Sequence, residues 1–161
     1  MILYLEVDGV LSAGRCYKAW PEVVLELDGL CWSPSMIGHL ISLQDRVELV
    51  WVSRYGGLCS MIAREMGMGK WGSDARVLTP VSGEYTEPSI YWKAEAIWSD
   101  LGRGLGSRID RWSWFDAGVG DLRGIRDYAD LVRGNGYVPE ISKDIGITPE
   151  NLITLELQIE V

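Results

Sequence analysis

The sequence predicts an α/β domain in which a central, mainly parallel sheet lies between layers of helices, a three-layer Rossmann-like architecture. Short apolar runs alternate along the chain with segments of helical periodicity, as they do in parallel α/β folds. Turn-forming residues close two of the runs: Asp8-Gly9 follows residues 2–7, and Asp116 begins the turn after residues 111–115. With 161 residues and no internal repeat or linker, we expect residues 1–161 to form a single domain.

The first half of the chain supplies two strands with a helix between them. Residues 2–7 are almost entirely apolar and predict a buried central strand, and residues 47–52 predict a second one. Between them, residues 23–27 indicate a small β segment. Ser33-Pro34 is typical of a helix start, because proline suits the first helical position. The apolar face of that helix consists of Met36, Ile37, Leu40, Ile41 and Leu43.

The second half continues the alternation of helices and strands. A final helix is expected to open at Thr148-Pro149, where Thr148 can cap the free N–H groups. The other expected elements are a helix over 58–66 that stops at Gly67, a short strand at 77–78, a helix over 89–101, a strand over 111–115 and a last parallel strand over 129–132.

Composition limits the classes of function. The chain is 47% hydrophobic and 24% charged, as in ordinary globular proteins. No apolar run approaches the roughly 20 residues that span a bilayer. Residues 1–11 lack a basic leader and already contain Glu6 and Asp8, so a cytoplasmic location without membrane contact is the expectation.

The net charge of −8 disfavours broad nucleic-acid binding, because an acidic surface repels phosphate backbones. A local basic patch remains an alternative. The arginines that could form such a patch are Arg103, Arg108 and Arg111, or Arg123, Arg126 and Arg133.

The glycine-rich residues 102–106 lack the phosphate-loop pattern and follow a helix, so a flexible connection is the preferred interpretation.

Cysteine and histidine chemistry is limited. Cys16, Cys31 and Cys59 show neither CxxC spacing nor an even count, which favours reduced thiols over a disulfide frame or a zinc site. His39 is the only histidine, so a site with several histidine ligands is excluded. Its place in the helix that follows Ser33 favours a surface or packing role.

Polar side chains gather at the predicted strand ends. Glu6 and Asp8, Ser53 and Asp116 follow three strands, and Lys93 lies between the last two in sequence. Ligands bind beyond the carboxyl ends of parallel strands, so these residues can meet. Paired carboxylates could hold a hard cation such as Mg²⁺, and a lysine with a hydroxyl could hold phosphate oxygens. Simple turns after strands are the alternative interpretation.

These residues resemble the motifs of the haloacid dehalogenase (HAD) superfamily. The run LYLEVDGVL at residues 3–11 is similar to the first motif, in which hydrophobic residues precede DxDGV[LF]. LVWVS at 49–53 is similar to the second, Lys93 to the third and WFD at 114–116 to the fourth. GITPENL at 146–152 also resembles a helix start of small bacterial and phage members. The resemblance spans nearly the whole chain and implies a Mg²⁺-dependent phosphomonoester phosphatase.

The resemblance also implies roles for the site residues. Glu6 occupies the position of the nucleophile that attacks phosphorus, and Asp8 that of the acid and base. Ser53 would hydrogen-bond the phosphoryl group, and Lys93 would neutralise its charge. Mg²⁺ would be held by Glu6, the main-chain carbonyl of Asp8, and Asp116. Asp121 is a further candidate acid.

Two positions depart from the family pattern. Glu6 stands where the family has aspartate, and Ala117 where a second acid is usual after Asp116. The extra methylene displaces the carboxylate by about 1 Å, a shift that can cost roughly a hundredfold in rate. Loss of a neighbouring acid weakens metal placement. A catalytically inactive HAD-fold binding or interaction protein of phage or bacterial origin, a pseudoenzyme, is therefore the alternative.

The length of the segment between the first motif and the following helix indicates how open the site is and which ligands it admits. Residues 12–32 are too few for a large cap, so the site is expected to be open. It would admit a phosphorylated small molecule or a polynucleotide end. Trp92 flanks Lys93 and could stack on such a ligand, although core packing is the preferred interpretation for it and for Trp51, Trp112 and Trp114.

Overall fold

A five-stranded parallel sheet organises the chain. The computed structural model describes residues 1–22, 24–85, 87, 89–103, 111–119 and 136–160. The strand order is β5-β4-β1-β6-β7, and every pair is parallel. The strands are β1 (Ile2–Leu5), β4 (Glu48–Trp51), β5 (Arg76–Val77), β6 (Trp112–Phe115) and β7 (Gly136–Tyr137). The predicted α/β class and parallel sheet are confirmed.

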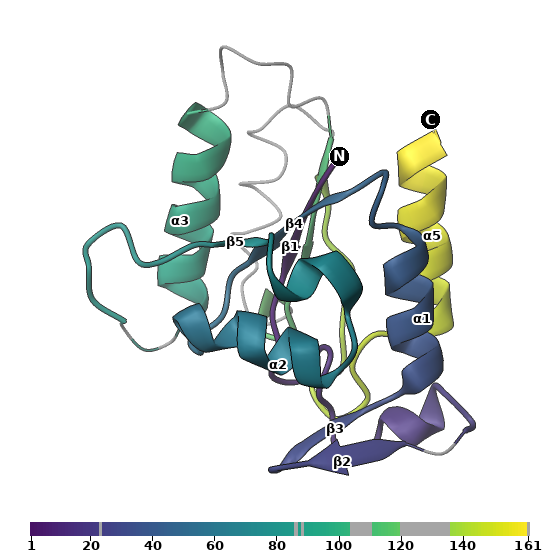
Figure 1. Cartoon of the computed structure of the whole chain (residues 1–161). Helices are drawn as coiled ribbons and strands as arrows, with labels where there is room; N and C mark the ends of the chain where they lie inside the picture. Colours follow the sequence, from purple (N-terminus) through teal and green to yellow (C-terminus); the bar gives the residue numbers. More distant parts are fainter. Residues whose placement is uncertain (23, 86, 88, 104–110, 120–135, 161) are drawn as a thin grey trace.

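Helices cover both faces of this sheet, giving three layers (Figure 1). On one face, α1 (Pro34–Ser42), α2 (Cys59–Glu65) and α5 (Pro149–Glu160) pack on Leu3 and Leu5 of β1. On the other face, α3 (Ile90–Arg103) packs on Tyr4. Successive strand residues point to opposite faces, so the uninterrupted apolar run of β1 reflects burial on both sides.

Side-chain caps fix the starts of two helices. Ser33 Oγ accepts a hydrogen bond from Met36 N at 3.1 Å, and Pro34 occupies the first position of α1. At the start of α5, Asn151 Oδ1 accepts from Thr148 N at 2.9 Å, and Thr148 Oγ1 accepts from Asn151 N at 3.4 Å. Both predicted helix starts are confirmed.

The segment between β1 and α1 is small, as expected for a domain without a large cap. It holds a two-stranded antiparallel hairpin, β2 (Leu25–Leu27) and β3 (Leu30–Trp32). The hairpin turns at Asp28-Gly29, where both residues have positive φ, a conformation that glycine adopts without steric penalty. Elsewhere in the described part of the chain, three short segments form 3₁₀ turns: η1 (Cys16–Lys18), η2 (Gly56–Leu58) and η3 (Gly69–Gly72).

The structure differs from the sequence prediction in its shortest strands. β3 and β7 were not predicted, because runs of two or three residues carry too little periodicity to be recognised. The third strand occupies Arg76–Val77, one residue earlier than expected. The predicted strand at 129–132 lies outside the described residues, as do Asp121, Arg108, Arg123, Arg126, Arg133, residues 104–106 and the side chain of Arg103.

Within the ranges described, no helix combines the length and apolar character needed to cross a membrane.

Candidate functional site

The predicted site residues follow the carboxyl ends of the three central strands. Glu6 follows β1, Asp116 follows β6, and Ser53 lies just beyond β4. Because these strands are parallel neighbours, their ends meet at one edge of the sheet. Lys93 lies in the first turn of α3, which covers the face of the sheet toward which Tyr4 points. Four residues that are far apart in the sequence are thus brought to one end of the fold.

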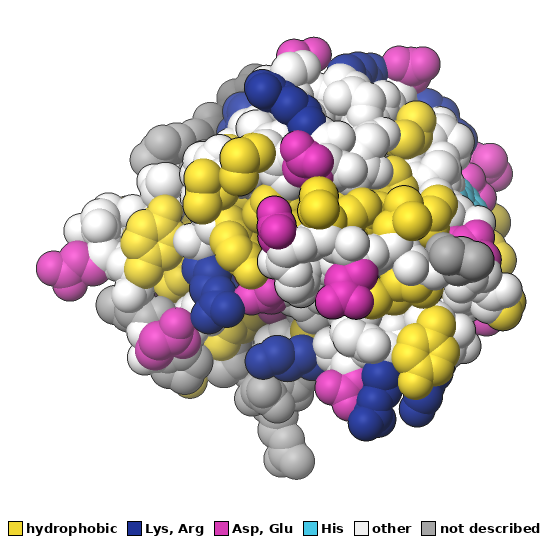
Figure 2. Space-filling view, turned by 60° about the horizontal axis from the view of Figure 1, so that its bottom comes forward, with side chains coloured by type: hydrophobic (Ala, Val, Ile, Leu, Met, Phe, Trp, Pro, Cys, Tyr) yellow, Lys and Arg dark blue, Asp and Glu magenta, His cyan; other side chains and the backbone are white. Residues whose placement is uncertain are grey.

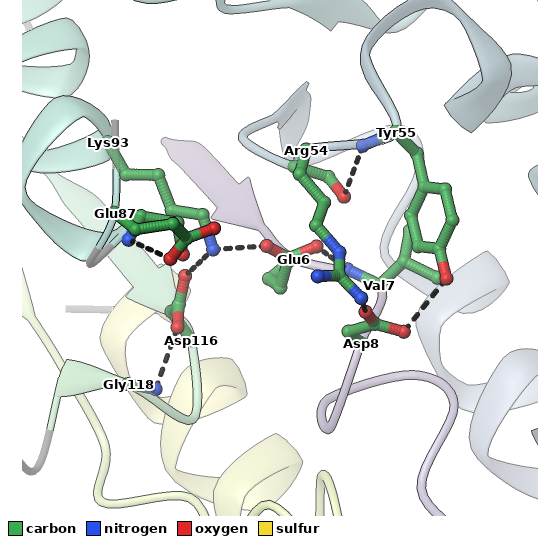
Figure 3. Close-up of polar contacts among 11 residues, drawn as sticks. Glu6, Val7, Asp8, Arg54, Tyr55, Glu87, Lys93, Asp116 and Gly118 are labelled. Atoms are coloured by element: carbon green, nitrogen blue, oxygen red, sulfur yellow. Dashed lines mark hydrogen bonds and ion pairs between the residues drawn. The ribbon is translucent and has the colours of Figure 1, made fainter. Parts of the chain in front are cut away.

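Glu6, Lys93 and Asp116 form a buried triad (Figure 3). Lys93 Nζ donates to Glu6 Oε2 and, at 2.7 Å, to Asp116 Oδ2. The other carboxylate oxygens are held by main-chain N–H groups: Glu6 Oε1 accepts from Val7 N at 2.7 Å, and Asp116 Oδ1 accepts from Gly118 N at 2.8 Å. Each of the three charged residues is at most 4% exposed. One ammonium group is therefore shared by two buried carboxylates.

Burial and charge together perturb this triad. Burial raises the pKa of Glu6; the Lys93 ammonium and the Ser53 hydroxyl oppose the rise, while Asp116 adds to it. Burial by itself lowers the pKa of Lys93, but the Asp116 and Glu6 carboxylates outweigh it, and the net pKa is raised. Burial is thus the main cause that disfavours ionised Glu6, and the Lys93 ammonium only partly offsets it.

Asp8 belongs to a second cluster. Its Oδ2 accepts a hydrogen bond from Arg54 Nη2 at 2.7 Å, and its Oδ1 accepts one from the Tyr55 hydroxyl at 3.0 Å. The Arg54 guanidinium lies 6.0 Å from the centre of the Tyr55 ring. The attraction of Asp8 raises the pKa of Arg54, and burial followed by the hydrogen bond to Asp8 raises that of Tyr55. Figure 3 shows this cluster on the opposite side of Glu6 from Lys93 and Asp116.

Ser53 is fully buried and interacts with both clusters, through Glu6 and Tyr55. Its Oγ accepts a hydrogen bond from Tyr55 N at 3.3 Å, which holds the turn that carries Arg54 and Tyr55. Cys59 lies close by in α2, and burial raises the pKa of its thiol to about 12. A thiol with that pKa stays protonated near neutral pH, so we assign Cys59 to packing instead of chemistry.

The donor set matches a hard cation in type. Glu6 and Asp116 offer carboxylate oxygens around Lys93 Nζ, and the family resemblance adds the main-chain carbonyl of Asp8; oxygen ligands are those that Mg²⁺ prefers. Among the described residues, no group of three or more acidic, histidine or cysteine side chains lies in a metal-binding arrangement. A Mg²⁺ site here would therefore combine two carboxylates with the Asp8 carbonyl and water, after Lys93 shifts from between the carboxylates.

The sequence analysis named Glu6, Lys93 and Asp116 as site residues, but it missed their ion pairing and the partners of Asp8. Arg54 and Tyr55 directly follow Ser53, and that adjacency was the only available signal. Trp92 is 2% exposed, which confirms core packing over a stacking surface. His39 lies on α1, where its Nε2 is 3.1 Å from Glu156 Oε1 of α5, in the surface role expected for it.

Fold and site together define an α/β protein with a buried acid–lysine–acid triad at the carboxyl edge of a parallel sheet. The chain matches no protein-family model, and neither a curated protein nor a solved structure is significantly similar to it.

Proposed function

We propose that this chain is a phosphohydrolase of the HAD type that acts on phosphomonoesters with Mg²⁺. One observation carries the proposal: Lys93 bridges the carboxylates of Glu6 and Asp116 in a buried site where β1 and β6 end. A buried ammonium group beside two acids provides both a phosphate-binding charge and oxygen ligands for a divalent cation. The resemblance of residues 3–11, 49–53, 93 and 114–116 to the four HAD motifs supports the same conclusion.

In this proposal each residue of the site has one role. Glu6 attacks phosphorus through a carboxylate oxygen and forms an acyl phosphate, while the ester oxygen leaves with a proton from Asp8. Asp8 then takes a proton from the water that hydrolyses the acyl phosphate. Lys93 and the Ser53 hydroxyl hold the non-transferring oxygens. Bound Mg²⁺ would neutralise charge on the same oxygens.

A second candidate function is phosphate-ester binding without turnover. It is favoured by the position of Glu6, whose two oxygens are both engaged, one by Val7 N and one by Lys93 Nζ. A nucleophile needs a free oxygen lone pair aligned with phosphorus at about 3–3.5 Å. The longer glutamate side chain reaches back to its own main chain, so catalysis requires it to turn.

Glu6→Asp tests both candidates. The purified protein and this variant are assayed with p-nitrophenyl phosphate and Mg²⁺, and binding of inorganic phosphate is measured by calorimetry. Activity in the parent supports the phosphohydrolase. Activity only in Glu6→Asp indicates an intact site that glutamate disables, and phosphate binding without turnover in both proteins supports the binding function.

Two controls complete the design. Lys93→Met should abolish turnover and phosphate binding, while Lys70→Met, which removes an exposed lysine paired with Asp45 at 2.8 Å, should change neither. If folded parent and Glu6→Asp proteins neither hydrolyse a phosphomonoester nor bind phosphate or Mg²⁺, both candidate functions are wrong.

A further inference from the structure

Arg54 is an exposed cation beside Asp8 and Tyr55. Its Nη2 contacts Asp8 at 2.7 Å, yet 61% of its side chain is exposed. An ion pair this exposed contributes little to stability, because water screens it. The guanidinium has five N–H donors in a planar fork, and the contact with Asp8 uses one of them. Arg54 therefore retains donors for an anion that approaches from solvent.

Lys143 packs against the same turn, at Gly9. A Cβ atom on Gly9 would come within 2.8 Å of Lys143 Cγ, so the lysine side chain packs directly on the Asp8-Gly9 backbone. Lys143 itself is exposed. Among the ion pairs of the described ranges, none involves Lys143. Arg54, which pairs with Asp8, and Lys143, which packs on Gly9, are thus two exposed cations next to the Asp8-Gly9 turn, and we call them the outer cations.

Two exposed cations lie near one turn although the chain as a whole has a net charge of −8. Figure 2 brings this end of the molecule forward and shows Lys and Arg side chains scattered among acidic and hydrophobic ones, without a broad basic area. A long polyanion would meet repulsion on such a surface. A single extra anionic group could be recognised by the outer cations alone.

We infer that the outer cations, Arg54 and Lys143, bind a second anionic group on the alcohol portion of the phosphomonoester, so that the preferred substrate carries two anions. The inference rests on the proposed function, because Asp8 marks the leaving-group side of the site only if it protonates the ester oxygen. Lys93, buried across Glu6, serves the transferred phosphoryl group. The outer cations then decide specificity and not the chemistry itself.

Matched ligands isolate the second anion. Propyl phosphate and 3-phosphooxypropanoate differ at one end, where a carboxylate replaces a methyl group. Their dissociation constants are measured by calorimetry with Mg²⁺ on the parent protein and on Glu6→Asp. We expect the carboxylated ligand to bind about tenfold more tightly, as charge-assisted hydrogen bonds at a partly exposed site allow. A dithymidylate with a terminal 3′-phosphate tests whether a phosphodiester supplies the anion instead.

Variants of the outer cations test the assignment. Arg54→Met and Lys143→Met should each reduce the affinity ratio of the ligand pair, and Arg54→Lys should restore part of it. Arg46→Met is the matched control: Arg46 is 43% exposed, pairs with Glu156 at 4.0 Å, and precedes β4 at the opposite edge of the sheet. It should leave the ratio unchanged. Thermal denaturation verifies that each variant is folded.

The outcomes separate the two proposals. The inference is overturned, while the proposed function stands, if propyl phosphate binds and neither 3-phosphooxypropanoate nor the dithymidylate binds more tightly than it does. The same holds if one of them binds more tightly but Arg54→Met leaves that difference unchanged. If no phosphate ligand binds to the parent or to Glu6→Asp, the proposed function fails and takes the inference with it. A preference seen with the dinucleotide alone, and lost in Arg54→Met, assigns the second anion to a polynucleotide end.

Discussion

Replacing Lys93 by methionine removes the only ammonium group in the buried triad. Glu6 and Asp116 would then remain 3% and 4% exposed without a cation between them. Breaking a buried ion pair by deleting one partner costs about 3–5 kcal/mol, because the remaining charge stays buried. That is a large share of the roughly 5–15 kcal/mol that stabilises a typical domain. At about 2–4 °C per kcal/mol for a chain of this size, Tm should fall by roughly 6–20 °C.

The loss of stability in Lys93→Met should depend on pH in a defined direction. Burial already raises the pKa of Glu6 with Lys93 present, and removing Lys93 raises it further. A carboxyl group whose pKa is higher in the folded than in the unfolded protein binds its proton first in the folded state. The contribution of the protonated carboxyl group to folded-state stability is therefore complete below its pKa in the unfolded protein. That contribution is lost as pH rises through its pKa in the folded protein. The gap in Tm between parent and Lys93→Met should narrow as pH falls from 7.5 towards 5.

Thermal unfolding followed by circular dichroism across that pH range measures the effect. Lys70→Met is the control for loss of a lysine, since its partner Asp45 is almost fully exposed. The double variant Lys93→Met with Glu6→Gln should regain part of the lost stability, because one buried charge disappears. A Lys93→Met protein with parental Tm at pH 7.5 would refute the buried triad as described.

Four further substitutions probe the fold and the site. Glu6→Gln should raise Tm at pH 7.5 by a few degrees, since it removes a buried carboxylate whose charged form burial disfavours; a lower Tm would contradict this reading of the triad. Ser33→Ala should cost about 1 kcal/mol in urea unfolding through loss of the α1 cap, and no change would mean that the cap is dispensable. Gly146→Ala should destabilise more than Gly29→Ala: both have positive φ, but only at Gly146 would a Cβ meet the carbonyl oxygen of Val10, at 2.4 Å. Equal losses in urea unfolding would show that backbone strain alone decides the cost.

The buried strands and the capped helices were predictable because their signals are local. The apolar run of β1 reflects burial on both faces, and the cap at Ser33-Pro34 needs only neighbouring residues. The approach of the residues that follow the strands was also foreseeable in outline. Residues at the ends of parallel strands share one edge of the sheet, so Glu6, Ser53 and Asp116 had to approach one another.

The strand β7 could not be predicted, since its two residues owe their conformation to a neighbour. A Cβ on Gly136 would lie 2.3 Å from Trp112 Cζ2, so glycine is required where β7 runs beside β6. The residues around Gly136 do not predict that its backbone packs against the ring of Trp112. Edge strands of this length are set by the sheet that they join.

The sequence by itself determined the fold class and the residues that gather at the carboxyl edge of the sheet, because strand periodicity and chain order are local properties. Only the tertiary structure decided how those residues pair. Asp8 and Arg54 are 46 positions apart, and Lys93 reaches Glu6 across 87, distances over which a sequence carries no information about which charge meets which. Glu6 and Asp8 are two residues apart, yet one lies in a buried triad and the other beside an exposed arginine. Burial and partners, which only packing defines, give the two carboxylates different chemistry.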